Sequence, residues 1–257
     1  MSPILLLASL LAADARSISL QASPVSWGSD CFSVRTSPAS LTRIEGVCTG
    51  FTLRSSDSGD GFEGSCASQL EKIYAGAAAG TGTWGGDTTF VCAAAAYVLT
   101  GTPQGFLEGF FGPSICAGAS LEGSWIGGDS ASLAATASIQ FSVFPTFAIG
   151  ASIREIPLVL ADGREMSSFG DYGATYIFNR DFRAMFSYSR DRARFGGQLA
   201  ASRALSLRAG TDGRSWSAGA GISLGRLTLD LAADFDDSTV SPCASILFDI
   251  GGAEPWN

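Results

Sequence analysis

The chain has 257 residues, including 32 glycines, and only 16% of its residues are charged. Its net charge of -8 argues against nucleic acid as a partner, because a nucleic-acid site needs a basic surface. The sequence contains no histidine, which excludes Ser-His-Asp and Cys-His catalysis and histidine-based zinc sites.

The N-terminus has the features of an export signal. Residues 4–13 form a short apolar run, and the small residues Ala13 and Ala15 follow in a pattern typical of signal-peptidase cleavage before Arg16. No basic residue precedes the run, so a buried N-terminal segment is the alternative. We predict a signal peptide over residues 1–15, an N-terminal segment over 16–45 as a candidate plug, a barrel over 46–250 and a tail over 251–257.

Six cysteines, at positions 31, 48, 66, 92, 116 and 243, show no CxxC spacing, which argues against a zinc or iron–sulfur site. In an oxidising compartment they could cross-link loops. In strands rich in glycine and alanine, a cysteine serves equally well as a small apolar residue. Both interpretations remain open, and we predict no cofactor or metal.

In the first half of the chain we expect strands near residues 46–54, 69–79, 88–99 and 115–124. The uncharged stretches 88–107 and 130–153 resemble membrane helices in composition only. Within the second stretch, Ile139, Phe141 and Val143 alternate with Gln140 and Ser142, which is the period of a strand and not of a helix. Pro145 then interrupts this strand.

The same alternation returns along the second half, and turn signals separate the segments. The expected strands lie near residues 147–154, 172–178, 182–189, 195–202, 205–208, 216–223 and 227–232. Lipid tolerates no unpaired strand edge, so strands of this kind must close on themselves. We therefore predict an all-β fold, a closed antiparallel transmembrane β-barrel of about 12–14 strands in the outer membrane.

Aromatic residues near the expected strand ends would form girdles at the two membrane interfaces. They are Tyr172, Phe178, Tyr188, Phe195 and Trp216. The alternative is core packing in a soluble β-sandwich. A sandwich should carry lysine and glutamate on its polar face, whereas this face consists mostly of glycine, serine, threonine and alanine, which favours the barrel.

Three segments carry a resemblance to a known family. Residues 36–46, TSPASLTRIEG, resemble the NPAGLA-type element that precedes the first barrel strand in the FadL/PorV-like outer-membrane superfamily, with Ser37 in place of Asn and Ser40 in place of Gly. Residues 205–230 and 147–156 resemble late and middle strands of that superfamily. The resemblance implies a barrel that takes up long-chain fatty acids or other hydrophobic compounds, or that assists surface-protein export.

The first functional hypothesis is a transporter of a hydrophobic small molecule, plugged by residues 16–45. Charged side chains facing lipid cost roughly 2 to 4 kcal/mol for arginine, so polar residues of the strands are expected to point inward. These candidates are Gln140, Arg154, Arg183, Gln198, Arg208 and Asp230. An arginine could pair with a fatty-acid carboxylate, or the set could simply form an Arg–Asp ladder that stiffens the barrel.

The second hypothesis is a general porin, or an adhesin-type barrel whose outer loops near residues 55–65 and 100–114 bind a host or envelope protein. Phe106, Phe110 and Phe111 would line the ligand entrance in a transporter, form a contact patch in an adhesin, or anchor a loop by burial. We predict no enzymatic activity, because the sequence has neither histidine nor a GxSxG element.

Overall fold

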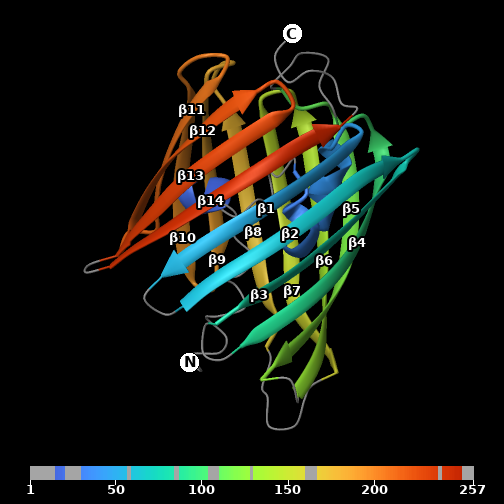
Figure 1. The fold of residues 1–257 in the computed structure, drawn as a ribbon. Helices are drawn as coiled ribbons and strands as arrows, with labels where there is room; N and C mark the ends of the chain where they lie inside the picture. Colours follow the sequence, from blue (N-terminus) through green and yellow to red (C-terminus); the bar gives the residue numbers. More distant parts are fainter. Residues whose placement is uncertain are drawn as a thin grey trace.

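The computed structural model describes residues 15–20, 30–56, 59–83, 87–103, 110–127, 130–159, 167–236 and 239–250. Within these parts, fourteen strands form one closed antiparallel barrel (Figure 1), which confirms the predicted fold class. The strands are β1 (Val47–Ser56), β2 (Gly59–Leu70), β3 (Ile73–Gly82), β4 (Thr88–Gly101), β5 (Ser114–Ile126), β6 (Ser130–Phe144), β7 (Phe147–Val159), β8 (Phe169–Ile177), β9 (Phe182–Ser189), β10 (Arg192–Ala200), β11 (Leu205–Thr211), β12 (Trp216–Leu224), β13 (Leu227–Asp236) and β14 (Thr239–Ile250).

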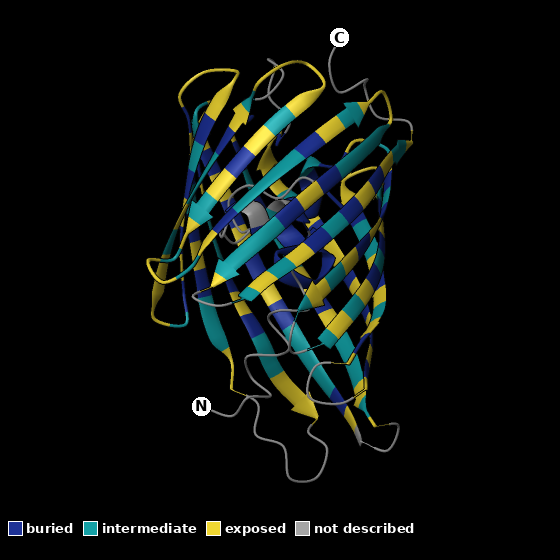
Figure 2. Cartoon of the chain, turned by 60° about the vertical axis from the view of Figure 1, so that its left-hand side comes forward, coloured by how far each residue is buried: buried dark blue, intermediate teal, exposed yellow. Residues whose placement is uncertain are grey.

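The barrel wall is apolar outside and mostly polar inside. In β6, Ile139, Phe141 and Val143 are exposed on the outer face, whereas Gln140 and Ser142 are buried on the inner face. Figure 2 shows the resulting bands of buried and exposed residues along the strands. The period of two seen in the sequence therefore gives the true orientation of these side chains.

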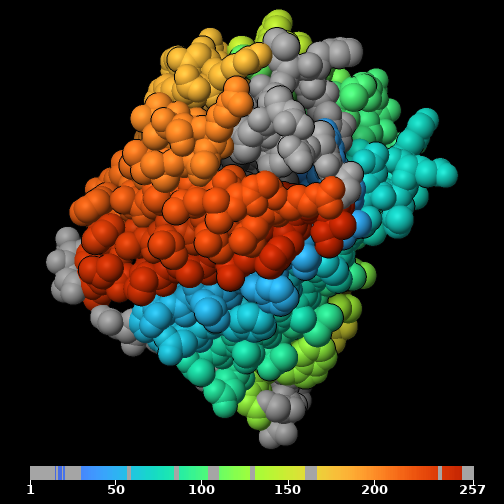
Figure 3. Space-filling model, turned by 45° about the horizontal axis from the view of Figure 1, so that its top comes forward, coloured from blue at the N-terminus to red at the C-terminus, as the bar shows by residue number. Residues whose placement is uncertain are grey.

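Each strand pairs with its sequence neighbours, and β14 pairs with β1 to close the barrel, with Val47 opposite Ile250. Figure 3 shows β14, in red, against β1, in blue. Because successive connections alternate between the two ends, the β1–β2 and β4–β5 connections lie at opposite ends.

Two strands, β2 and β14, were not among the expected ones. The region 55–65, interpreted from the sequence as a loop, consists largely of the end of β1 and the first half of β2. Its glycines and acidic residues suggest a loop, yet the backbone of residues 61–65 pairs with both β1 and β3. The prediction of a binding loop near residues 55–65 is therefore wrong. The predicted loops near 55–65 and 100–114 cannot form one surface, because the β1–β2 and β4–β5 connections lie at opposite ends of the barrel.

The five aromatic residues assigned to membrane girdles are all exposed on the outer face. Trp216 stacks on Phe235 with ring centroids 4.1 Å apart, near the end of the barrel that carries the β11–β12 connection. Phe178 packs edge-on against Tyr176 at 4.8 Å, near the opposite end. Aromatic rings thus gather outside both ends of the wall.

Three short helical segments lie inside the barrel (Figure 1): α2 (Ala15–Leu20), α3 (Ser33–Thr36) and the 3-10 helix η2 (Pro38–Arg43). The α3 and η2 segments pack against β3, β4 and β5, and α2 packs against the wall from β10 to β14. Among the described residues, no helix is both long and apolar enough to cross a membrane. We call residues 30–43 the plug.

Most of the cysteines are packing residues. Cys48, Cys92 and Cys116 are buried free thiols, and Cys66 is an exposed one. Cys48 and Cys92 belong to the largest apolar cluster, with Val34 and Leu41 of the plug. For these four positions the small-apolar-residue interpretation therefore holds over the cross-linking one.

Candidate functional site

The plug rests on glycines of the inner wall. A Cβ atom built on Gly118 of β5 would lie 2.5 Å from the backbone nitrogen of Ala39 and 2.6 Å from the carbonyl carbon of Pro38. On Gly76 of β3 it would lie 2.5 Å from a methyl carbon of Val34. Residues without a side chain therefore provide the space in which the plug backbone approaches the sheet.

Replacing Gly118 with alanine is expected to displace η2, because both atoms in the way belong to the backbone. Overpacking of this kind costs about 1–3 kcal/mol, which corresponds to roughly a tenfold rise in the population of displaced plug. Trypsin cleavage after Arg43 in detergent should accelerate by that factor. Gly197→Ala is the matched control, because its Cβ would meet the nearest heavy atom at 3.6 Å. Equal cleavage rates in both variants would contradict the proposed contact.

Hydrogen bonds also fix the segment whose sequence resembles the superfamily element. The backbone nitrogen of Ala39 donates to Oγ of Ser138 at 2.8 Å, and Nε2 of Gln140 donates to Oγ of Ser40 at 3.4 Å. Within the segment, Thr42 donates to the carbonyl oxygen of Ala39 at 2.8 Å. Gln140, a predicted ligand-binding residue, therefore faces inward and contacts the plug.

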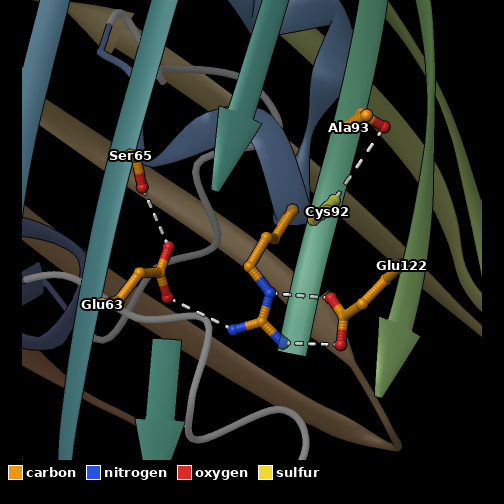
Figure 4. A network of polar contacts seen from close by, with 6 residues as sticks. Glu63, Ser65, Cys92, Ala93 and Glu122 are labelled. Atoms are coloured by element: carbon orange, nitrogen blue, oxygen red, sulfur yellow. Dashed lines mark hydrogen bonds and ion pairs between the residues drawn. The ribbon is translucent and has the colours of Figure 1, made fainter. Parts of the chain in front are cut away.

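A buried ion cluster joins the plug to two strands. Nε and Nη2 of Arg35 donate to the two carboxylate oxygens of Glu122 at 2.7 and 2.8 Å, and Nη1 donates to Glu63 at 3.2 Å. Figure 4 shows the Glu63 and Glu122 carboxylates reaching toward the same point from β2 and β5, with Ser65 donating to Glu63. The Arg35 guanidinium also lies 3.6 Å above the centre of the Phe90 ring.

Burial lowers the pKa of the Arg35 guanidinium, but the charges of Glu122 and Glu63 outweigh this and hold that pKa above its usual value. A cation shared by two carboxylates in the interior is an effective latch between plug and wall. We call Arg35, Glu63 and Glu122 the plug latch. The sequence analysis missed all three residues.

The second plug arginine has a different environment. Arg43 lies 4.2 Å from the centre of the Phe111 ring, and burial lowers its pKa to about 9, so that it remains charged at neutral pH. Phe111 itself is buried against Ala148 and Ile177, with Phe110 partly buried beside them. Phe106 lies outside the described residues. Phe111 is thus a buried anchor in this structure, and a ligand role for the phenylalanines stays a prediction.

Strand register brings three predicted residues into one row on the inner wall. Arg183 of β9 lies opposite Gln198 of β10, and Gln198 lies opposite Arg208 of β11. All three are buried, and so is Asp230 of β13, which accepts a hydrogen bond from Arg208. Arg208 also donates to Ser206 at 2.8 Å.

Arg154 lies apart from this row. It pairs with Asp171 at 3.2 Å, and the neighbouring Glu155 pairs with Arg190 at 3.2 Å. The Phe169 ring lies beside the guanidinium groups of Arg154 and Arg190. Arg154, Arg208 and Asp230 therefore form Arg–Asp pairs of the kind that the ladder interpretation predicts, and their role in ligand binding remains untested.

The row continues from Arg208 to the seam between the first and last strands. Each of its members lies opposite the next: Arg208, Gly219, Ala232, Cys243 and Arg54. Helix α2 covers this stretch, because Ile18 packs with Ala232 and Cys243. The backbone nitrogen of Ala15 donates to Oγ of Ser245 at 2.9 Å.

The seam between β1 and β14 is incomplete. Their pairing ends at Arg54 and Cys243, although β1 continues to pair with β2, and β14 with β13. The amide of Asp249 donates toward β13, so by alternation the amides of even-numbered β14 residues point toward β1. Residue 242 is a proline and has no amide hydrogen for the next bond to Ser55.

A cavity of about 810 Å³ lies at this incomplete seam. Its lining includes the inward-facing Ala232 and Cys243 as well as Leu53 and Leu231, which are 60% and 63% exposed on the outer face. Residues from both faces of the wall therefore line the cavity. It lies at the end of the row of inward-facing residues that begins at Arg183.

Comparison with known proteins identifies the fold. No protein-family model matches the sequence, and no curated protein matches it. Among solved structures, the CymD monoaromatic hydrocarbon channel is similar at a TM-score of 0.65 and 12% identity, over 94% of this chain and 98% of that one. The toluene transporter TbuX of Ralstonia pickettii is similar at 0.59 and 11%, over 94% and 98%. At these identities the likeness establishes the barrel fold.

Proposed function

We propose that this chain spans the outer membrane as a plugged channel that mediates uptake of small hydrophobic molecules, such as long-chain fatty acids. The observation that carries the proposal is a closed barrel with an apolar outer face and the N-terminal part of the chain packed inside it. The similar structures support it, since one is a hydrocarbon channel and the other a toluene transporter.

In this proposal residues 1–15 are the export signal, and cleavage before Arg16 leaves most of α2 in the lumen. The ligand passes along the row from Arg183 to Arg54 and leaves through the cavity at the β1–β14 seam, into lipid. The plug latch keeps the channel closed to ions. No chemical step is involved, and lipid and the hydrophobic ligand are the partners.

Two observations weigh against the alternatives. A general porin needs an open lumen, whereas α2, α3 and η2 lie inside this barrel. The adhesin hypothesis loses one of its two predicted binding loops, because residues 59–65 belong to β2.

The test is refolding of residues 16–257 into detergent, followed by far-UV circular dichroism and heat-modifiable gel mobility. Saturable binding of a fluorescent long-chain fatty acid, with low ion conductance in planar bilayers, would support the proposal. High conductance without fatty-acid binding would favour a porin. A protein that stays soluble without detergent would overturn the membrane assignment.

Replacing Pro242 with valine is expected to close the seam, because valine restores the missing amide hydrogen opposite Ser55. Exit of the fluorescent fatty acid into the bilayer of proteoliposomes should then fall by at least about fivefold, as expected when one good hydrogen bond stabilises the closed seam. Ile246→Val is the matched control, on the same strand and face but within the paired part and away from the cavity lining. Unchanged exit in Pro242→Val would rule out the seam as the route.

A further inference from the structure

Gln198 is a buried polar side chain that the barrel leaves unsatisfied. Its exposed fraction is 9%, and its Oε1 atom has no hydrogen-bond partner among the described residues. A buried acceptor without a partner is destabilising, so such atoms are few in folded proteins and each one calls for an explanation, of which a ligand is one. Gln198 is therefore the first place to look for a ligand contact.

Two charged side chains flank Gln198 on the inner wall. Arg183 and Arg208 flank it on the two neighbouring strands. Arg208 is neutralised by Asp230, with which it forms a buried ion pair. The Arg208 charge is therefore already offset by a carboxylate of the wall, and Gln198 adds an uncharged acceptor and donor between the two arginines.

An apolar patch lies next to this polar group. Gly196, the previous inward-facing residue of β10, lies opposite Met185, and Met185 packs with Leu20 of α2. The carbonyl oxygen of Leu20 would lie 2.3 Å from a Cβ atom on Gly196. Leu20 thus occupies a position next to Gln198 that an apolar ligand body could fill when α2 moves.

We infer that Gln198 recognises the hydroxyl group of an otherwise apolar molecule, such as a phenol or an alcohol. This inference rests on the proposed uptake of small hydrophobic molecules, and for this site it favours hydroxyl-bearing molecules over the fatty acids given there as an example. A hydroxyl donates to Oε1 and accepts from the Gln198 amide, so it satisfies both ends of the side chain. A pure hydrocarbon leaves Oε1 unpaired, and a carboxylate has no hydrogen to donate to it.

The experiment is isothermal titration calorimetry on the full refolded chain in detergent with four probes of one skeleton: toluene, p-cresol, 4-methylanisole and p-toluate. p-Cresol should bind about fivefold to tenfold more tightly than toluene, the value of one or two hydrogen bonds. 4-Methylanisole, which has no hydroxyl hydrogen, should bind like toluene. Gln198→Met should reduce p-cresol affinity to that of toluene and leave toluene unchanged. Gln69→Met, an exposed glutamine at the end of β2, is the matched control.

Equal affinities of p-cresol and 4-methylanisole for the unaltered chain would overturn the inference without any variant, and so would tightest binding of p-toluate. Failure of the proposed function looks different. If p-cresol binds through Gln198 but the protein transports neither p-cresol nor the fatty acid in proteoliposomes, the site stands and the channel does not. If transport occurs and Gln198→Met leaves the p-cresol preference intact, the channel stands and the site does not.

Discussion

Replacing Arg35 with methionine is expected to open the channel to ions. The change leaves Glu63 and Glu122 as neighbouring carboxylates without their shared cation, and Glu63 is buried. Removing one partner of a buried ion pair costs about 3–5 kcal/mol, which the plug relieves by leaving the wall. The ratio of open to closed channels should rise at least about a hundredfold, measured as single-channel conductance in planar bilayers.

Two further variants separate the latch from a general loss of packing. Arg35→Met combined with Glu63→Gln and Glu122→Gln removes the stranded charges and should restore most of the closed state. Arg43→Met removes the other buried plug arginine, including its contact with the Phe111 ring, which is worth about 1–2 kcal/mol. It leaves Glu63 and Glu122 with their shared cation, so it should open the channel much less. Conductance in Arg35→Met equal to that of the unaltered chain, with heat-modifiable mobility intact, would refute the latch.

Replacing Asp230 with alanine is expected to give the largest loss of barrel stability. Asp230 is 1% exposed and holds Arg208 across β12, where Gly221 leaves room for both side chains. Without Asp230 the buried Arg208 loses its counter-charge, at a cost of about 3–5 kcal/mol. Urea unfolding in detergent, followed by tryptophan fluorescence, measures this as a lower midpoint with an unchanged slope.

The double variant Arg208→Met with Asp230→Leu provides the control. Replacing a whole buried pair by apolar residues of similar size is often neutral, so most of the lost stability should return. An equally unstable double variant would mean that packing space around Gly221, and not charge, sets the stability of this region.

The alternation of apolar and polar residues made most of the wall predictable from the sequence. It assigned Gln198, Arg208 and Asp230 to the inner face, where the structure has them. It failed for β2 because Glu63 and the surrounding glycines resemble a loop, and the cation that makes Glu63 acceptable in a strand lies 28 positions earlier in the chain. Pairing across the lumen depends on barrel closure, which no local pattern encodes.

The sequence contains weak signals of the plug latch and of the incomplete seam between β1 and β14. Arg35 is the one charged residue between Asp30 and Arg43, and Glu122 is the one charged residue of an expected strand. Pro242 is a signal of the second feature, because prolines in sheets occur at edge strands and at interruptions of the pairing. Each signal marks a residue that departs from the alternating pattern of a barrel strand. Only the strand register in the folded barrel shows which of these residues lie close together.

The missing amide at Pro242 also gives this barrel a mechanical weak point. In a fully bonded cylinder, separating any two strands must begin by breaking intact hydrogen bonds. Here the joint between β1 and β14 already has a crack at one end, beyond Arg54 and Cys243. Thermal opening of the β1–β14 pair can begin at this end and proceed one hydrogen bond at a time. In the proposed route, a bulky molecule would pass by lengthening this gap, while the other thirteen strand pairs of the barrel stay closed.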